Sequence, residues 1–230
     1  MRKQQKIWLK EHTSRATLPS MANSEPASGA VQFTNWLRDN TDVESGKAVD
    51  IGSGKGRNSV HLAGCGYLVW GLEYVQPAIE FAESLAKKKH VEEKIVFKLT
   101  EIDKRWDFSD DFFDVAIDHF SSIDIETKSG RELCRDEMYR TLKPNGYALV
   151  AVCSVDDEWE KELIEEFPGP ERNSTLWPGS GKFQKDYDEE ELREFYSKFE
   201  ILELKEISKP AHKLGRAGTA TNFWVILRKK

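Results

Sequence analysis

The sequence predicts a single α/β domain, a three-layer sandwich in which helices cover both faces of a seven-stranded sheet. Short apolar runs alternate with longer segments of helical periodicity, which is typical of parallel strands joined by crossover helices. A glycine-rich turn follows the first apolar run, and no internal repeat divides the 230 residues. We expect a mostly parallel sheet in which the seventh strand is antiparallel.

Seven apolar runs are predicted as strands because turn residues or helical segments bound each of them. In chain order they cover residues 47–51, 67–72, 94–99, 113–117, 147–153, 199–207 and 222–228. The sequence KPNG at residues 143–146 is expected to turn the chain into the fifth strand.

The helices are predicted from apolar residues spaced three or four positions apart. Ser28 is expected to cap the second helix, Pro77 to open the fourth in its first turn, and Asp188 to cap the last. The helices cover residues 4–12, 29–39, 57–63, 77–89, 130–142, 157–167 and 188–197. Residues 168–186 are predicted as a long loop that roofs a binding site.

The chain is expected to divide into a lead-in and a core. Residues 1–44 are predicted as a helical lead-in and lid, with Trp8 positioned to close over a ligand, and residues 45–230 as the α/β domain. Basic residues dominate the first 15 positions, but no apolar signal segment accompanies them, so we expect a solvated helix rather than a targeting signal.

Composition excludes several classes of function. The net charge of −6 argues against a nucleic-acid partner, because phosphate binding usually leaves a basic footprint. No apolar run reaches the roughly 18 residues of a membrane span. The three cysteines show no CxxC spacing, so neither a metal site nor a disulfide framework is expected, and a cytoplasmic location is predicted. The oligomeric state stays open.

The turn after the first strand carries three glycines, in the sequence AVDIGSGKG at residues 48–56. Such a turn lets the backbone approach a nucleoside where a Cβ would collide. Glu73 ends the second strand, about 20 residues downstream, where a carboxylate can accept hydrogen bonds from ribose hydroxyls. Arg57 stands where a dinucleotide fingerprint needs its third glycine, which disfavours a nicotinamide oxidoreductase.

This turn resembles the cofactor motif of class I S-adenosylmethionine (SAM)-dependent methyltransferases. FFDVAI at residues 112–117 and LKPNGYALV at residues 142–150 are similar to two further segments of that family. The resemblance covers residues 45–155 and implies a Rossmann-like fold, SAM as cofactor and S-adenosylhomocysteine as product. GRNS at residues 56–59, the segment 183–199, the last apolar strand and the basic tail resemble the tellurite-resistance and thiopurine methyltransferase-like branch.

The resemblance implies cofactor contacts for the residues that match the family's motifs. Asp50 and the glycines would surround the methionine part of SAM, Glu73 would bind the ribose, and Tyr74 would pack near the adenine. Either Glu101 or Asp103 would be the adenine-side acid, and the spacing favours Glu101. The predicted cofactor set is Asp50, Gly52, Ser53, Gly54, Gly56, Glu73, Tyr74, Glu101, Ile102 and Asp118.

The residues after the fourth strand, DHFSS at 118–122, are expected to face the methyl group. His119 is the candidate general base because its ordinary pKa is near neutral, and a pocket-lining role is the alternative. Asp118 is the candidate for positioning the substrate or the amino group of SAM. Arg57 is either a surface residue or a partner for the carboxylate of SAM.

A basic loop is expected beside the site if the sixth strand runs parallel to the others. Residues 208–218 would then bring Lys209, His212, Lys213 and Arg216 to the mouth and favour an anionic substrate; a solvated loop is the alternative. The sequence thus predicts a SAM-dependent methyltransferase for a small-molecule acceptor, with anionic and thiol-bearing compounds as candidates. An RNA or protein methyltransferase and a non-catalytic SAM-binding protein are the alternatives.

Overall fold

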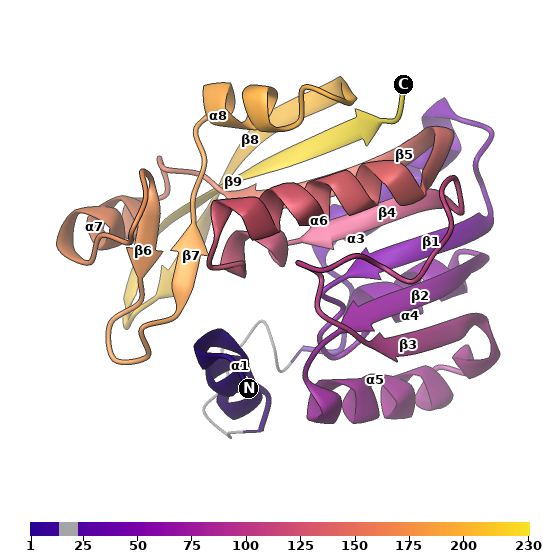
Figure 1. Ribbon diagram of the computed structural model, residues 1–230, viewed down its shortest axis with the longest axis horizontal. Helices are drawn as coiled ribbons and strands as arrows, with labels where there is room; N and C mark the ends of the chain where they lie inside the picture. The colour runs from indigo at the N-terminus through magenta and orange to yellow at the C-terminus, as the bar shows by residue number, and fades with distance from the viewer. Residues whose placement is uncertain (14–22) are drawn as a thin grey trace.

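A seven-stranded sheet forms the centre of the computed structural model, which describes residues 1–13 and 23–230 (Figure 1). The strand order is β3-β2-β1-β4-β5-β9-β8. The strands are β1 (Gly46–Ile51), β2 (Tyr67–Glu73), β3 (Ile95–Leu99), β4 (Phe113–His119), β5 (Leu142–Cys153), β8 (Glu200–Lys213) and β9 (Arg216–Arg228). Strands β1 to β5 pair in parallel, and β9 is antiparallel to both β5 and β8. The predicted sheet with an antiparallel seventh strand is confirmed.

Helices cover both faces of this sheet and bury its apolar side chains in two clusters. Phe33 and Leu37 of α3 (Ser28–Asn40) and Leu62 of α4 (Arg57–Gly64) pack on one face. The other face is covered by α6 (Lys128–Thr141) and α8 (Glu189–Phe195). The helix α5 (Gln76–Lys88) lies beside α4 and β3. The three-layer arrangement therefore follows from helical periodicity set against strands that are buried on both faces.

Two local predictions about caps and turns were wrong. Ser28 is the first residue of α3, and Ala27 occupies the cap position without a side-chain hydrogen bond. KPNG lies within β5, whose register against β4 shifts between Phe113 and Val115. Asn145 in this stretch has a φ of 62°, so the backbone bulges and then rejoins the ladder instead of turning before it.

The predicted roof loop and basic loop are both hairpins. The segment 168–186 contains β6 (Ser174–Leu176) and β7 (Phe183–Lys185), which pair antiparallel and follow α7 (Glu158–Glu166). Pairs this short leave no alternation for sequence analysis to detect. Strands β8 and β9 continue pairing as far as Lys213 and Arg216, so residues 208–218 form the tip of a long hairpin.

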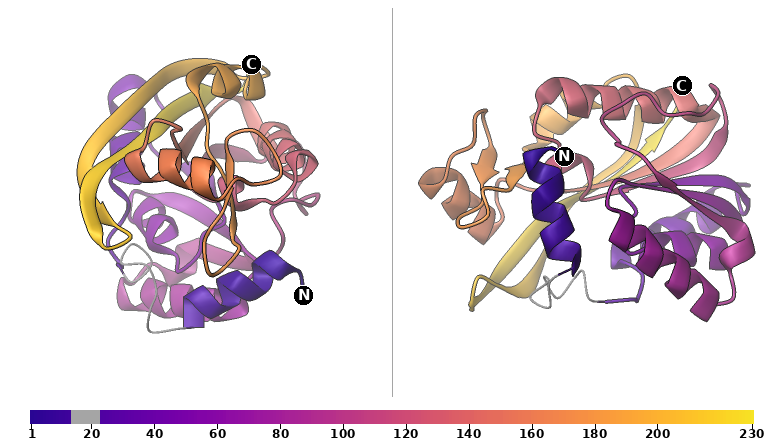
Figure 2. Two further views of the ribbon diagram at one scale, coloured as in Figure 1. Left: turned by 90° about the vertical axis from the view of Figure 1, so that its left-hand side faces the viewer. Right: turned by 60° about the horizontal axis from the view of Figure 1, so that its bottom comes forward.

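The carboxyl ends of the parallel strands meet at one edge of the sheet, and three additional elements gather there. The helix α1 (Lys3–Thr13) lies between α5 and the β6–β7 hairpin, and the tip of the β8–β9 hairpin extends past the same edge (Figure 2). None of the described helices combines the length and the apolar character that a bilayer crossing requires. This edge, enclosed on several sides, is where a site is expected in an open parallel sheet.

Candidate active site at the carboxyl edge of the sheet

A cavity of about 1050 Å³ lies at this edge. Its turn side is formed by the glycine turn and the ends of β2 and β3, and includes Gly52, Gly54, Glu73, Tyr74 and Ile102. Its hairpin side is formed around the β6–β7 hairpin and includes Asp124, Glu160, Lys182 and Gln184. Small-molecule pockets usually measure about 300–1,000 Å³, so this cavity has room for two small ligands side by side.

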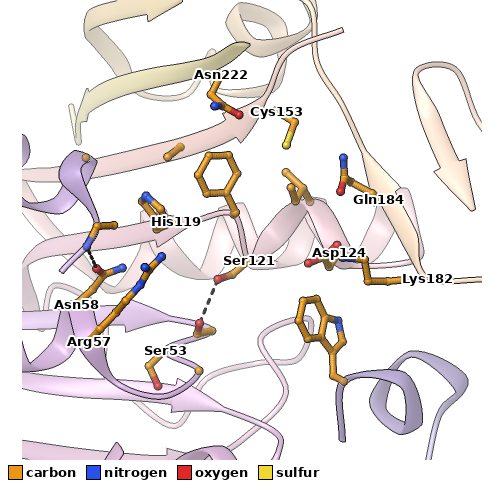
Figure 3. Close-up of a pocket in the computed structure, with 18 of the residues that line it drawn as sticks. Ser53, Arg57, Asn58, His119, Ser121, Asp124, Cys153, Lys182, Gln184 and Asn222 are labelled. Carbon is orange, nitrogen blue, oxygen red and sulfur yellow. Dashed lines mark hydrogen bonds between the residues drawn. The ribbon is translucent and has the colours of Figure 1, made fainter. Parts of the chain in front are cut away.

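The glycine turn presents bare backbone to the cavity. Gly52 and Gly54 have φ angles of 65° and 52°, which favour glycine. A Cβ on Gly52 would lie 2.5 Å from the Cβ of Ser121, whose hydroxyl donates to the Gly52 carbonyl at 3.1 Å (Figure 3). Among the described residues, a Cβ on Gly54 would meet only His12, at 3.7 Å. Gly54 therefore keeps open a space that a ligand can enter, and Ser53 lines the cavity between the two glycines.

Asp50 and Gly56 support the turn from behind and do not line the cavity. The Asp50 carboxylate accepts a hydrogen bond from the Ser59 hydroxyl at 2.6 Å, and burial raises its pKa to about 6. A Cβ on Gly56 would lie 2.6 Å from the Cβ of Ala82, so this glycine allows α4 and α5 to approach closely. The positions of Asp50 and Gly56 therefore do not support the predicted contact of either residue with a ligand.

Glu73 is buried at the end of β2, and its carboxylate organises the backbone around it. It accepts hydrogen bonds from the backbone N–H of Gly54 at 3.0 Å and of Tyr74 and Val75 at 2.8 Å each. Burial raises the pKa of Glu73, and these three donors oppose that shift. A carboxylate offers about four lone-pair sites, so capacity remains for a hydroxyl of a ligand in the cavity that Glu73 and Tyr74 line.

The two candidate acids after β3 both line the cavity, and both contact Arg2, which directly precedes α1. Arg2 donates to the two carboxylate oxygens of Asp103, at 3.0 Å for the longer bond, and lies 3.1 Å from Glu101. Ile102 lies between them on the cavity wall. The choice between Glu101 and Asp103 stays open. Arg2 was missed by sequence analysis because nothing local marks a contact across 101 positions.

Asp118 and His119 end β4 in different environments. The Asp118 carboxylate is buried off the cavity wall and accepts the backbone N–H of Ser121 and Ser122 at 3.2 and 3.1 Å. It thereby fixes the turn after β4, and its position gives no support to the predicted contact with substrate or cofactor. His119 does line the cavity, with its ring 4.7 Å from that of Phe120.

The basicity of His119 is lower than a general base working near pH 7 requires. Burial, reinforced by the positive charge of Arg57, lowers its pKa to about 3. The imidazole is therefore neutral near pH 7 and is a weak proton acceptor. Arg57 points toward it in the cavity and makes no hydrogen bond or ion pair with the described part of the chain (Figure 3). Its guanidinium is thus available to an anionic group of a ligand.

The hairpin side holds charged and amide groups that sequence analysis missed. The Gln184 amide donates to Glu160 at 2.8 Å and to Asp186 at 2.7 Å, and its oxygen accepts from the Trp177 indole at 3.1 Å. Asp124 lies beside Lys182 (Figure 3). Trp177, Lys182, Gln184 and Asp186 come from the segment predicted as a loop, whereas Asp124 and Glu160 come from other elements. No sequence spacing marks these residues as neighbours.

Helix α1 contacts both sides of the cavity through two glutamines. The Gln4 amide donates to the carbonyls of Asp124 and Phe183, each at 3.1 Å. The Gln5 amide donates to the carbonyl of Tyr74, also at 3.1 Å. Trp8 of the same helix lines the cavity, and its predicted closure over a ligand stays a prediction.

The predicted basic loop is only partly available to a ligand. Lys209, His212 and Lys213 line the cavity, whereas Arg216 pairs with Glu162 outside it. Lys213 is engaged by two carboxylates, Asp157 at 3.2 Å and Glu160 at 3.1 Å. Within residues 1–13 and 23–230, no cluster of His, Cys, Asp and Glu has the arrangement of a metal site.

Comparison with known proteins identifies the family. A model described as a methyltransferase domain matches residues 42–196. The chain belongs to this methyltransferase family. A SAM-dependent methyltransferase from Methanosarcina mazei has a similar structure, with a TM-score of 0.71 and 25% identity, over 84% of this chain and 96% of that one. A search of curated protein sequences finds no match.

Two further structures share the methyltransferase fold. One is 1,6-didemethyltoxoflavin-N1-methyltransferase from Burkholderia thailandensis with bound S-adenosylhomocysteine, at a TM-score of 0.65 and 16% identity, over 88% of this chain and 79% of that one. The other is TehB from Haemophilus influenzae, with a TM-score of 0.63 and 19% identity, over 100% of this chain and 68% of that one. At these identities the likeness concerns the fold, so the tellurite-resistance branch is not distinguished from the wider family.

The chain is a SAM-dependent methyltransferase, and its turn side fits SAM. Gly54 leaves open a space that any side chain would fill, and Glu73 has unused acceptor capacity. Arg57 presents a cation without a protein partner among the described residues. These features match a ligand that combines a nucleoside with an amino-acid carboxylate.

Proposed function

We propose that the protein transfers the methyl group of SAM to a small-molecule acceptor bound on the hairpin side of the cavity. The observation that carries this proposal is one continuous cavity of about 1050 Å³, enclosed by α1 and the two hairpins. A small molecule fits beside SAM in a cavity of this volume. An RNA or a protein acceptor needs an open approach to the methyl group. The Burkholderia thailandensis enzyme of the same fold binds a small molecule, 1,6-didemethyltoxoflavin.

We assign the residues of the turn side to binding and orientation of the cofactor. Glu73 binds the ribose hydroxyls, Tyr74 and Ile102 line the adenine region, and Gly52, Ser53 and Gly54 form the floor. Arg57 binds the carboxylate. Asp50, Gly56 and Asp118 hold this floor and the neighbouring turn in place through the contacts described above.

When bound, SAM supplies a methyl group on a sulfonium, which reacts by in-line displacement. Such a reaction depends chiefly on alignment and on exclusion of water. Neutral His119 and the Phe120 ring supply a dry wall at the end of β4. We propose that His119 shapes this wall and that a protonated acceptor loses its proton to another group.

We propose that residues 1–44 act as a lid and lead-in. The contacts of Arg2, Gln4 and Gln5 hold α1 across both sides of the cavity, which supports a movement of α1 when a ligand enters or leaves. We also propose a cytoplasmic location, in keeping with three free cysteine thiols at positions 65, 134 and 153.

Radiolabelled SAM tests the choice of acceptor. The purified protein is incubated with metabolite extracts, RNA and protein fractions, and labelled products are separated by size. We expect label in the small-molecule fraction. Gly54→Val is the matched inactive control, because its side chain would occupy the cofactor space and the backbone there has a left-handed φ. Label found only in RNA or protein would refute the proposal.

A further inference from the structure

Lys182 is a largely buried lysine whose ammonium group forms no ion pair within the described part of the chain. Its residue surface is 8% exposed, yet Nζ makes no hydrogen bond or ion pair with any described residue. The Nζ atom lies 4.8 Å from the ring centroid of Trp8 and 4.9 Å from that of Trp177. The two indole faces attract the cation, but they leave its N–H donors without acceptors. A buried cation in this state favours binding an anion.

The neighbouring lysines show that the chain ordinarily pairs such groups. Lys213 contacts Asp157 and Glu160, and Lys185 lies 3.1 Å from Glu191 and also donates to a backbone carbonyl. Both lysines therefore have structural partners close to hand. Lys182 lies in the same region and lines the cavity without one.

Besides the two indole rings, Lys182 has a polar neighbour, Asp124. Its Oδ1 atom is buried and has no hydrogen-bond partner within the described structure. Burial raises the pKa of Asp124 to about 7, although the nearby Lys182 opposes that shift. Near neutral pH a substantial fraction of this carboxyl is protonated and can donate a hydrogen bond. The two groups together offer one positive charge and one neutral donor.

We propose that Lys182, Asp124, Trp8 and Trp177 form a subsite for the carboxylate of the methyl acceptor, which is therefore a small organic acid. This inference rests on the proposed function and specifies its acceptor class. One ammonium beside an acid matches a monoanion; a phosphate dianion would call for further cations around it. The subsite opens into the same cavity as Gly54 and Glu73, so the acid shares one enclosed space with SAM.

Binding measurements on the full chain loaded with S-adenosylhomocysteine test the subsite. The probes are a panel of small aromatic and aliphatic monocarboxylic acids, each matched with its neutral amide, and calorimetry measures their affinity. We expect at least one acid to bind ten-fold or more tightly than its amide. Lys182→Met should abolish that preference and leave the affinity for S-adenosylhomocysteine within two-fold. Lys128→Met, on the exposed surface of α6, should change neither.

Thermal unfolding separates this role from a structural one. Removing an unpaired buried charge should leave the Tm of Lys182→Met equal to or above that of the wild type. Lys213→Met should lower the Tm, because it leaves Asp157 and Glu160 without their cation. The subsite is refuted if no acid is preferred to its amide, or if Lys182→Met retains the preference. Methyl transfer to small molecules that is indifferent to Lys182→Met would refute the subsite alone, whereas label confined to macromolecules would refute the proposed function.

Discussion

The two sides of the cavity are built from different chemical groups. On the turn side, backbone groups form most of the surface. Two glycines with left-handed φ angles form the floor, and Glu73 accepts hydrogen bonds from three backbone N–H groups. On the hairpin side, side chains dominate. Among the described residues, the buried Oδ1 of Asp124 has no hydrogen-bond partner, and Nζ of Lys182 contacts two indole rings without forming an ion pair. Under the proposed function, the turn side is therefore complete before an acceptor binds, whereas the acceptor completes the hairpin side.

The largest expected effect concerns the carboxylate that organises the turn side. Glu73→Ala removes the proposed acceptor for ribose hydroxyls and leaves the N–H of Gly54 without its partner. Each hydrogen bond to a charged group contributes about 1.5–3 kcal/mol, so we expect SAM affinity to fall by about 10- to 100-fold. Calorimetry with SAM and S-adenosylhomocysteine measures this change. Glu73→Gln should lose less, and unchanged affinity in Glu73→Ala would remove the assignment to the ribose.

The next effect concerns the incomplete hairpin side and its dependence on pH. Burial raises the pKa of Asp124 from an ordinary 3.8 to about 7, so the folded state binds this proton more tightly than the unfolded state does. The associated stability is present below about pH 4 and is lost as the pH rises toward 7. We expect Asp124→Asn to make the decline of Tm between about pH 4 and pH 7 shallower, by on the order of 10 °C.

Asp50 provides the reference for that measurement. Its pKa is raised to about 6 by burial, so it contributes a decline of its own that Asp124→Asn leaves in place. The slope of Tm against pH in the variant should therefore be reduced but not zero. An identical slope in wild type and Asp124→Asn would show that Asp124 is ionised in the folded protein throughout this range.

A smaller effect on cofactor dissociation is expected where the N-terminal segment contacts the turn side. Arg2→Ala removes the contacts with Asp103 and Glu101, and partly exposed ion pairs contribute about 0.2–1 kcal/mol. We expect S-adenosylhomocysteine to dissociate about two- to five-fold faster, as measured by stopped-flow fluorescence. Arg38→Ala, which removes an exposed pair with Asp39, serves as the control. Equal dissociation rates in all three proteins would argue against a lid.

The smallest effect is expected at His119. Because burial beside Arg57 lowers its pKa to about 3, the ring is neutral throughout the range from pH 5 to 8. His119→Gln should therefore leave the shape of the pH–rate profile unchanged over this range, whatever it does to the rate itself. Loss of an inflection near pH 6.5 in the variant would restore His119 as the general base.

The same contrast explains what the sequence could and could not predict. The turn side comes largely from a contiguous stretch. Its three glycines, with one acid at a fixed distance, predict the backbone conformation of the turn from sequence alone. Asp118 was predicted as a ligand contact because sequence position alone does not show that its oxygens accept the N–H groups of Ser121 and Ser122. The spacing of residues identifies a turn, but it does not show whether a carboxylate binds a ligand or the protein backbone.

The hairpin side could not be assembled from sequence because its parts are distant in the chain. Trp8, Asp124 and Lys182 meet only in the folded protein, and the strands that position Lys182 are three residues long. Periodicity over three residues does not distinguish a strand from a loop. The prediction of an anionic substrate came from Lys209 and its neighbours at the hairpin tip, whereas the buried, unpaired cation lies elsewhere.

Helix α1 contacts both sides of the cavity and, under the proposed function, borders both ligands. Gln5 binds the backbone beside the cofactor residues, Gln4 binds the backbone of the hairpin side, and Trp8 lies against Lys182. A ligand that stabilises α1 from one side therefore prepares it for the other, and the coupling free energy must be reciprocal. Such an enzyme should add its substrates in a preferred order and bind them cooperatively, with the acceptor slowing the escape of the cofactor.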